Sequence, residues 1–300
     1  MKLKSVVLSL SIISALTLIP CNFSNAGTTS NGYDSSLKLV GIDYETYQNM
    51  PQNKQTMYKD VKVSNVTSTT KYYKCTEKNN TVNALYGTTD TKDNFNETTM
   101  KEISKDQFNF ETTANLDSSF IRSLSEDTDS TSTSWVEMTT KLGSINSKEY
   151  ILSNDVTYIK SNGFLQPINT HIIGLGTNAN FSVIANSEYL KRTYTLYSQE
   201  LGIYKPDQTD YDWNANEKST SGYAYTFNIV ETEISNKAFM ALRIKPNVSN
   251  TTVVDGFGHY SKYSTSVSPS LSFSSGGASL SISPTKKLST APNTHAQLHR

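Results

Sequence analysis

The carboxylate and amide side chains near position 210 have residue types and a spacing that could bind a divalent cation. Asp210, Asp212, Asn214 and Asn216 alternate along the chain like the first ligands of a calcium loop, and hard oxygen ligands suit calcium. The rest of that motif is missing, because Ala215 stands where the loop needs glycine. A structural calcium site and a solvated turn rich in Asp and Asn are the two interpretations, and no other cofactor is expected.

A glycine pattern upstream has the letters of a dinucleotide-binding loop. The run Gly174-Leu175-Gly176-Thr177-Asn178-Ala179 follows the apolar pair Ile172-Ile173 and spells G-x-G-x-x-A. A dinucleotide fold also needs a helix after the pattern and repeated strand–helix–strand units around it, which the sequence does not indicate. We therefore interpret this run as a flexible loop.

No arrangement of nucleophile and base points to catalysis. His295 and His299 are four residues apart, but they lie in a tail rich in Pro and Thr, so zinc is not predicted there. No G-x-S-x-G elbow occurs, and the polar residues around Cys75 contain nothing that would activate a thiolate. We predict no catalytic residues and favour a protein that is not an enzyme.

The charge balance indicates an uncharged partner. Lys plus Arg and Asp plus Glu both number 27, and only 18% of residues are charged, so neither nucleic acid nor an anionic lipid surface is expected as a partner. Aromatic rings on such a surface suit an extracellular polymer or protein. The candidate binding residues are Trp135, Trp213, His259 and Tyr260.

A serine-rich segment, Ser264 to Ser283, has the pattern of an amphipathic β-hairpin. Serines alternate with apolar residues, and Gly276-Gly277 marks a two-residue turn. That turn predicts Phe273 opposite Leu280 and, on the same face, Leu271 opposite Ile282. A slip of one residue would set serine against apolar residues, so the turn and the pattern support each other.

Two interpretations of this hairpin stay open. It could be a transmembrane β-hairpin with one stripe facing lipid and one facing water, or an amphipathic hairpin that covers the core of a soluble sandwich. Pro269 and the lack of aromatic residues at both ends favour the second interpretation. In the membrane interpretation the lipid-facing residues are Val267, Leu271, Phe273, Leu280 and Ile282.

Several of these short motifs together resemble an uncharacterised family of secreted proteins of Gram-positive bacteria, over roughly the second half of the chain. The motifs are Ser134-Trp135, Ile173-Gly174-Leu175-Gly176, Gly258-His259-Tyr260, Ser266-Val267-Ser268-Pro269-Ser270 and the Gly-Gly serine hairpin. The family has no established activity, so the resemblance implies only a bacterial extracellular protein.

The N-terminus has the features of a signal peptide. Lys2 and Lys4 precede an uncharged apolar run from Val6 to Ile19, which is shorter than the roughly 20 residues of a membrane-spanning helix. Small residues up to Ala26 predict cleavage after residue 26. The protein is then secreted, and Cys75 is left without a disulfide partner inside the chain.

Periodicity predicts a mainly β protein with an antiparallel, sandwich-like C-terminal domain and one or two short helices in the N-terminal half. Leu116 and the apolar residues after it predict a helix that begins behind Asn115. Tyr150, Leu152, Val156 and Tyr158 share one parity, as in a strand with one buried face. Segments 223–229 and 238–244 also alternate apolar residues and are expected to be neighbouring antiparallel strands. The expected divisions are a signal peptide (1–26), a disordered leader (27–36), a mixed N-terminal region (37–125), a linker rich in Ser, Thr and Asp (126–134), a β domain (131–283) and a polar tail (284–300).

Three functional hypotheses follow from different classes of protein. A secreted binding or surface-interaction protein without enzyme activity stands first. A membrane-active toxin, pore-forming or antibacterial, that inserts the serine-rich hairpin stands second. A hydrolase whose site is assembled from distant residues stands third.

Overall fold

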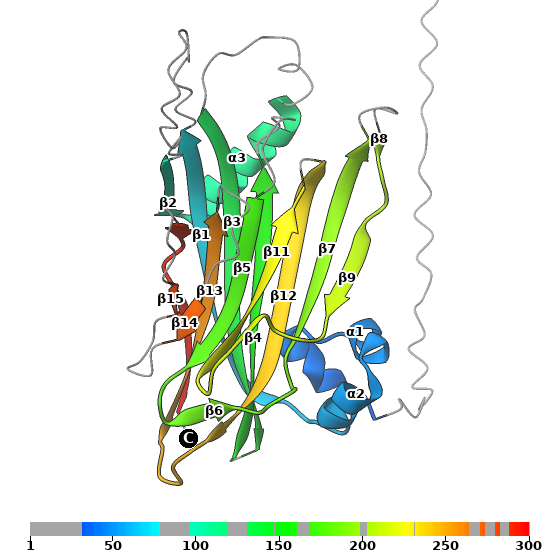
Figure 1. Ribbon diagram of the computed structural model, residues 1–300, viewed down its shortest axis with the longest axis vertical. Coiled ribbons are helices and arrows are strands. Elements are labelled where there is room, and N and C mark those ends of the chain that lie inside the picture. Colours follow the sequence, from blue (N-terminus) through cyan, green and yellow to red (C-terminus); the bar gives the residue numbers. More distant parts are fainter. Residues whose placement is uncertain are drawn as a thin grey trace, which may run out of the picture. The chain divides into compact units, whose positions relative to one another are not determined.

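A computed structural model describes residues 32–78, 97–118, 131–146, 148–160, 169–198, 203–230, 232–263, 271–273, 280–282 and 288–299. The strands pair antiparallel throughout this part of the chain (Figure 1). The predicted fold class, mainly β with antiparallel sheets, is confirmed.

The larger sheet, sheet A, has nine strands. Its order is β2-β1-β3-β4-β12-β7-β8, with β6 paired to β12 and β9 paired to β7. The strands are β1 (Ser64–Lys78), β2 (Glu97–Ile103), β3 (Thr131–Asn146), β4 (Glu149–Lys160), β6 (Phe181–Val183), β7 (Tyr189–Ser198), β8 (Ile203–Tyr204), β9 (Gln208–Asp212) and β12 (Glu233–Pro246).

The second sheet, sheet B, has six strands in the order β10-β11-β5-β13-β16, with β17 also paired to β13. A separate pair, β14 (Leu271–Phe273) and β15 (Leu280–Ile282), completes the described strands. The strands of sheet B are β5 (Asn169–Thr177), β10 (Glu217–Lys218), β11 (Gly222–Ile229), β13 (Val253–Tyr263), β16 (Leu288–Thr290) and β17 (Thr294–His299).

The main core lies between sheets A and B. Even-numbered residues of β4 and β12, such as Leu152 and Met240, join odd-numbered residues of β5 and β11, such as Ile173 and Tyr225, in one buried cluster. Because alternate residues of a strand point to opposite faces, these parities mark the inner face of each strand. The sequence assigned the inner faces of β4, β11 and β12 correctly.

The pairing of β11 with β12 was predicted wrongly. β11 pairs with β5 and β10 in sheet B, whereas β12 pairs with β4 and β7 in sheet A. The chain crosses from one sheet to the other between Ile229 and Glu233. Alternation shows that a strand has one dry face, and the dry faces of both sheets meet in the same core, so the pattern does not tell which sheet a strand joins.

Short helices cover part of the outer face of sheet A. Helix η1 (Ser35–Val40), a 3-10 helix, is capped by Asp34, and α1 (Tyr44–Asn49) is capped by Asp43 through the N–H of Thr46 at 2.6 Å. Helix α2 (Gln52–Tyr58) follows. Apolar residues of these helices form a second core with odd-numbered residues of β4 and β12: Leu37, Val40, Ile42, Tyr47, Met50 and Tyr58 pack with Ile151, Phe239 and Ala241.

Helix α3 (Lys105–Ser118) is longer and begins earlier than the sequence predicted. The hydroxyl of Ser104 accepts the N–H of Gln107, so Ser104 caps the helix, and Asn115 lies inside α3. A polar helix without an apolar stripe gives little periodicity to detect. The predicted residues beyond Ser118 lie outside the described part of the chain.

Three of the expected divisions are corrected. β1 pairs along its length with β3, so the region before the expected linker belongs to the same sheet as the β domain, and residues 131–134 are strand. Residues 35–36 of the expected leader are helical. Residues 288–290 and 294–299 of the expected tail pair with β13, because Thr294, Ala296 and Leu298 alternate inward as small or apolar side chains.

A buried polar contact joins the two sheets inside the main core. The amide nitrogen of Asn154 on β4 donates to the backbone carbonyls of Gly174 (3.4 Å) and His259 (3.2 Å) on sheet B. Its oxygen accepts from the hydroxyl of Thr140 (3.2 Å), which in turn contacts the hydroxyl of Thr294. The amide, the two carbonyls and the two hydroxyls are all paired inside the core, so the contact fixes the position of one sheet on the other at little net cost.

The Gly258→Ala variant tests how closely the sheets approach at this contact. A Cβ at Gly258 would lie 1.9 Å from the hydroxyl oxygen of Thr140 and 2.7 Å from the Asn154 amide oxygen. We expect a loss of about 2 kcal/mol or more in the free energy of unfolding, measured by urea denaturation. Gly176→Ala is the control, since its Cβ meets nothing closer than 3.4 Å; equal losses in the two variants would contradict this account.

Candidate functional site

The serine-rich segment connects two strands that are paired with each other. β13 runs into it, and β16 returns from it with Leu288 opposite Tyr263. Within the segment, β14 and β15 pair Leu271 with Ile282 and Phe273 with Leu280, which confirms the predicted register. Val267 and Pro269 lie outside the described residues.

Three of the four candidate binding residues are interior. Trp135 is covered by α3, and its indole N–H donates to the carboxylate of Glu111 at 2.7 Å. His259 is buried and contacts the amide oxygen of Asn293 through Nδ1 at 2.5 Å. The Tyr260 hydroxyl lies 2.5 Å from a ring nitrogen of His171 inside the main core. These three residues hold the structure together and present no surface to a partner.

Trp213 is the fourth candidate and keeps part of its ring exposed. It stacks on Tyr211 with ring centroids 5.2 Å apart and planes within 5°, and it packs against the second core beneath the helices. Ten tyrosines are buried along with Trp135. Tyr44, Phe110 and Tyr204 are also exposed, but they lie on three separate elements, α1, α3 and β8.

The candidate calcium residues do not converge. Asp210 and Asp212 are on β9, where a carboxylate oxygen of Asp212 accepts the N–H of Asn214. The side-chain oxygen of Asn216 accepts the N–H of Thr226 at 2.6 Å. Among the residues that the structure describes, no group of three His, Cys, Asp or Glu side chains could hold a metal ion. The Asp and Asn side chains here order a turn.

The glycine pattern lies in a strand, which corrects the predicted loop. Gly174 to Thr177 belong to β5, between β11 and β13. The small residues let neighbouring side chains lie close, as His259 does beside Gly176.

A surface cavity of about 190 Å³ lies over the outer face of sheet A. Two ion pairs line it: Lys191 with Asp43, and Lys237 with Asp155, each at 3.1 Å. Burial raises the pKa of Asp155, and the Lys237 ammonium partly offsets that shift. Each carboxylate is thus occupied by its own lysine, and the lining side chains contain no activated nucleophile for a hydrolase.

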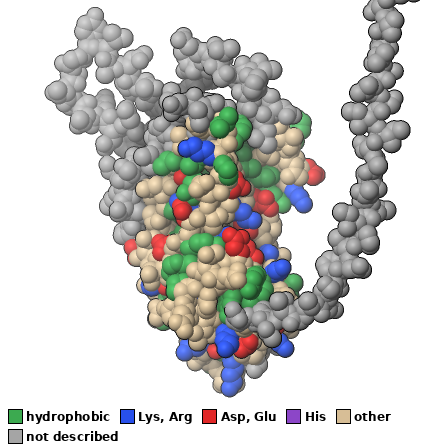
Figure 2. Space-filling model, turned by 90° about the vertical axis from the view of Figure 1, so that its right-hand side faces the viewer, with side chains coloured by type: hydrophobic (Ala, Val, Ile, Leu, Met, Phe, Trp, Pro, Cys, Tyr) green, Lys and Arg blue, Asp and Glu red, His purple; other side chains and the backbone are tan. Residues whose placement is uncertain are grey.

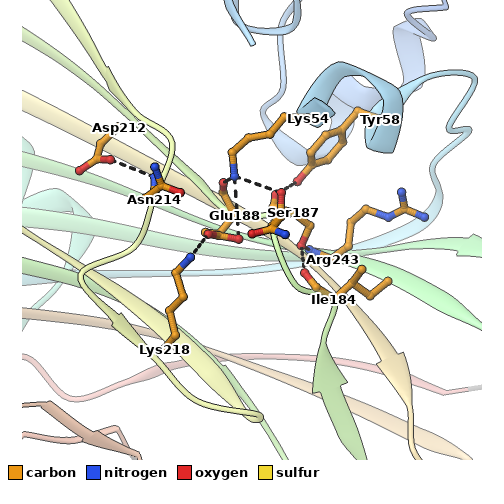
Figure 3. A network of polar contacts seen from close by, with 10 residues as sticks. Lys54, Tyr58, Ile184, Ser187, Glu188, Asp212, Asn214, Lys218 and Arg243 are labelled. Carbon is orange, nitrogen blue, oxygen red and sulfur yellow. Dashed lines mark hydrogen bonds and ion pairs between the residues drawn. The ribbon is translucent and has the colours of Figure 1, made fainter. Parts of the chain in front are cut away.

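A buried network attaches the N-terminal helices to sheet A (Figure 3). The ammonium of Lys54 on α2 donates to the backbone carbonyls of Glu188 (2.5 Å) and Asn186 (3.0 Å). The Glu188 carboxylate is fully buried, 3.9 Å from Lys54 and 2.5 Å from Lys218 on β10. Nearby, the Tyr58 hydroxyl donates to the carbonyl of Ser187 at 2.7 Å. These contacts hold α2, β10 and the start of β7 together.

At the far end of the inter-sheet space lies a group of charged residues that the sequence did not reveal. Lys160, Lys262 and His171 are buried there, and Arg192 pairs with Glu233 at 3.0 Å. They come from five different strands, so no local spacing connects them. The only hint in the sequence is parity: His171 occupies the same alternate positions of β5 as Ile173 and Leu175.

Comparison with known proteins gives little further information. No family model matches the chain, and no curated protein matches it. The solved structures that match include one described as "Pore forming protein", with 7% sequence identity and a TM-score of 0.23. The match covers 58% of this chain and 92% of that chain. A TM-score of that size is too low to define a shared fold.

The surface of the described residues carries both signs of charge. Figure 2 shows one face of the molecule, on which basic, acidic and hydrophobic side chains are interspersed. None of the helices in the described ranges is both long and apolar enough to cross a bilayer.

The Lys54→Met variant tests the buried network. Methionine keeps the volume but leaves two carbonyls without their donor and Glu188 with one cation fewer, so we expect a loss of about 3 kcal/mol in the free energy of unfolding. Lys237→Met is the matched control, because its ion pair with Asp155 is half exposed and should cost below about 1 kcal/mol. If urea denaturation gives similar losses in the free energy of unfolding for both variants, the buried network contributes no more stability than the exposed ion pair.

Proposed function

We propose that this protein is a secreted, membrane-active protein that inserts the segment Ser264–Ser283 into a bilayer as a transmembrane β-hairpin after several copies assemble. The observation that carries the proposal is the register of β14 and β15. It sets apolar positions against apolar positions, Leu271 against Ile282 and Phe273 against Leu280, and serine against serine between them. A ribbon with this register has one apolar stripe and one polar stripe.

The sequence of the segment fits the interior of a bilayer. No charged residue occurs from Ser264 to Thr285, and Lys286-Lys287 follow at once. A transmembrane β-strand needs about 9 to 11 residues. The arm before Gly276-Gly277, Ser264 to Ser275, has 12 residues, and the arm after it has eight uncharged residues, Ala278 to Thr285, and reaches ten with Lys286 and Lys287. Lysines at the base of an inserted hairpin can extend their ammonium groups to the headgroups.

The position of the segment in the fold supports the same function. β13 and β16 are already paired at its base, so both arms start from one antiparallel ladder. An inserted hairpin would continue that ladder and satisfy its own backbone hydrogen bonds, which a bilayer requires. The binding hypothesis loses support, because Trp135, His259 and Tyr260 are interior.

Dye release from vesicles tests the proposal with two matched double variants. Phe273→Asp with Leu280→Asp places two charges at directly opposed apolar positions, and Ser272→Asp with Ser281→Asp places the same two charges at the neighbouring opposed serine positions. At pH 7.4 and 5.0, with neutral, anionic and sterol-containing vesicles, we expect the wild-type chain from Gly27 to Arg300 to release dye. The first pair should slow release by roughly 100-fold, because charge on the lipid face is costly.

The serine-position pair should change release only a few-fold, since its charges face water in the inserted hairpin. Both variants carry the same repulsion between opposed carboxylates, so that repulsion cannot explain a difference between them. Circular dichroism confirms that each is folded. Absence of release by the wild type on every vesicle, or equal loss in both variants, would refute the membrane-active function.

A further inference from the structure

His171 lies on the inner face of β5, near the N-terminal end of the strand, and is fully buried between the two sheets. It is directly opposite Lys262 of β13 and directly opposite Phe227 of β11. Its ring stacks on Phe227, with planes within 18°, and meets the edge of the Tyr158 ring at a centroid distance of 4.8 Å. Lys262 is next to Tyr263, the last residue of β13 before the serine-rich segment.

The hydrogen bonds of the His171 ring suit the neutral imidazole. Nδ1 lies 2.5 Å from the Tyr260 hydroxyl, while Nε2 is buried and has no hydrogen-bond partner among the described residues. An unpaired ring nitrogen costs less on a neutral ring than on an imidazolium, which must place a charged N–H in an apolar environment.

The charged groups around His171 oppose its protonation. Burial lowers the pKa of His171 well below its ordinary value, and the cations Lys262 on β13, Lys160 on β4 and Arg192 on β7 lower it further. The described carboxylate of this group, Glu233 on β12, is already held by Arg192 at 3.0 Å and by the amide of Asn236 at 2.7 Å. Lys262 donates to the hydroxyl of Tyr158 at 2.8 Å.

Such an arrangement makes the intact ladder sensitive to acid. A base whose pKa is depressed in the folded state binds fewer protons than in the open state, so the folded state loses stability as the pH falls below the ordinary histidine value of about 6.5. Protonation also sets two like charges directly opposite each other at the His171 and Lys262 pair, which destabilises the ladder there.

We propose that His171 is an acid-sensitive switch: its protonation opens the end of the β5–β13 ladder at Lys262, from which the hairpin segment extends, and thereby promotes insertion of that segment. This regulation rests on the proposed membrane function, whereas the opening itself does not. At pH 5.0 a freed histidine with an ordinary pKa favours the open ladder by about 30-fold relative to pH 7.4.

Hydrogen exchange on the full chain measures the opening without any membrane. After correction for intrinsic exchange rates, the amides of Tyr260 to Tyr263 should open about 30-fold more often at pH 5.0 than at pH 7.4. The double variant His171→Phe with Tyr260→Phe removes the titrating ring and its partner together, so no buried donor is left unpaired. In this variant the ratio of amide opening at pH 5.0 to opening at pH 7.4 should fall at least about tenfold.

Two further variants separate the switch from general acid effects. Lys262→Met keeps His171 but removes the opposed charge, and should weaken the acid response. His259→Gln removes the other buried histidine of the β5–β13 ladder, whose pKa burial lowers to about 4, and should leave the acid response of the amides of Tyr260 to Tyr263 unchanged. Dye release at the two pH values is measured in parallel on the same proteins.

The outcomes separate the two proposals. The switch is supported if ladder opening and dye release both increase at pH 5.0 in the wild type and neither increases in the His171 variant. Equal opening at the two pH values, or an acid response that survives in the His171 variant, overturns the switch and leaves the membrane function standing wherever vesicles still leak. If the ladder opens at pH 5.0 but vesicles leak at neither pH, the acid response of the ladder is supported and its link to membrane insertion is refuted.

Discussion

The amide of Asn154 sets the geometry on which the sandwich depends. Apolar side chains can slide past one another at small cost, whereas an amide that donates to two carbonyls of the opposite sheet has one position that satisfies it. Both carbonyls, of Gly174 and His259, belong to adjacent strands of sheet B. Fixing β4 against β5 and β13 in this way also decides which side chains of the two sheets face each other further along those strands, including Tyr158 of β4 and His171 of β5.

The two ends of the inter-sheet space are built differently. At one end Lys54 and Lys218 compensate the buried Glu188, and Tyr58 and Lys54 supply donors to backbone carbonyls, so the helices and sheet A are joined by paired groups. The other end gathers three cations and a neutral imidazole with an unpaired nitrogen. Both ends leave buried side-chain atoms without a hydrogen-bond partner among the described residues, Glu188 Oε2 and Arg243 Nε at the first end and His171 Nε2 and Arg192 Nε at the second, so what distinguishes the second end is its titratable imidazole beside cations.

Patterns within short segments of the sequence were sufficient to predict strand faces and the register of the hairpin strands. The register expected from Gly276-Gly277 is the register that β14 and β15 have, and alternation identifies the inner faces of β4, β11 and β12. Features set by contacts between distant segments were missed. Trp135, His259 and Tyr260 look exposed and available in the sequence because their partners, Glu111, Asn293 and His171, lie 24, 34 and 89 residues away. The charged group around His171 was missed for the same reason.

Amino-acid composition predicted the strands less well than the alternation of inward and outward residues did. A stretch rich in Ser and Thr suggests a linker, yet residues 131–134 are strand and pair with β1 over their whole length. β17 reads as polar because its inward positions are occupied by the small side chains of Thr294 and Ala296 beside Leu298. In both segments the inner face is defined by every second residue, so an average over the segment hides it.

The register of the ladder explains why the hairpin could extend without rearranging its faces. Extending the β14–β15 register back to Tyr263 would bring it opposite Thr290, whereas the ladder at the base pairs Tyr263 with Leu288. The offset is two residues, which is one full period of a strand, so one continuous ribbon keeps every residue on its own face. An offset of one residue would instead have turned the serine positions of one arm toward the apolar stripe. An even offset is therefore compatible with the single hairpin that the proposed function requires, because a shift of one arm by two residues joins the two ladders and leaves both stripes intact.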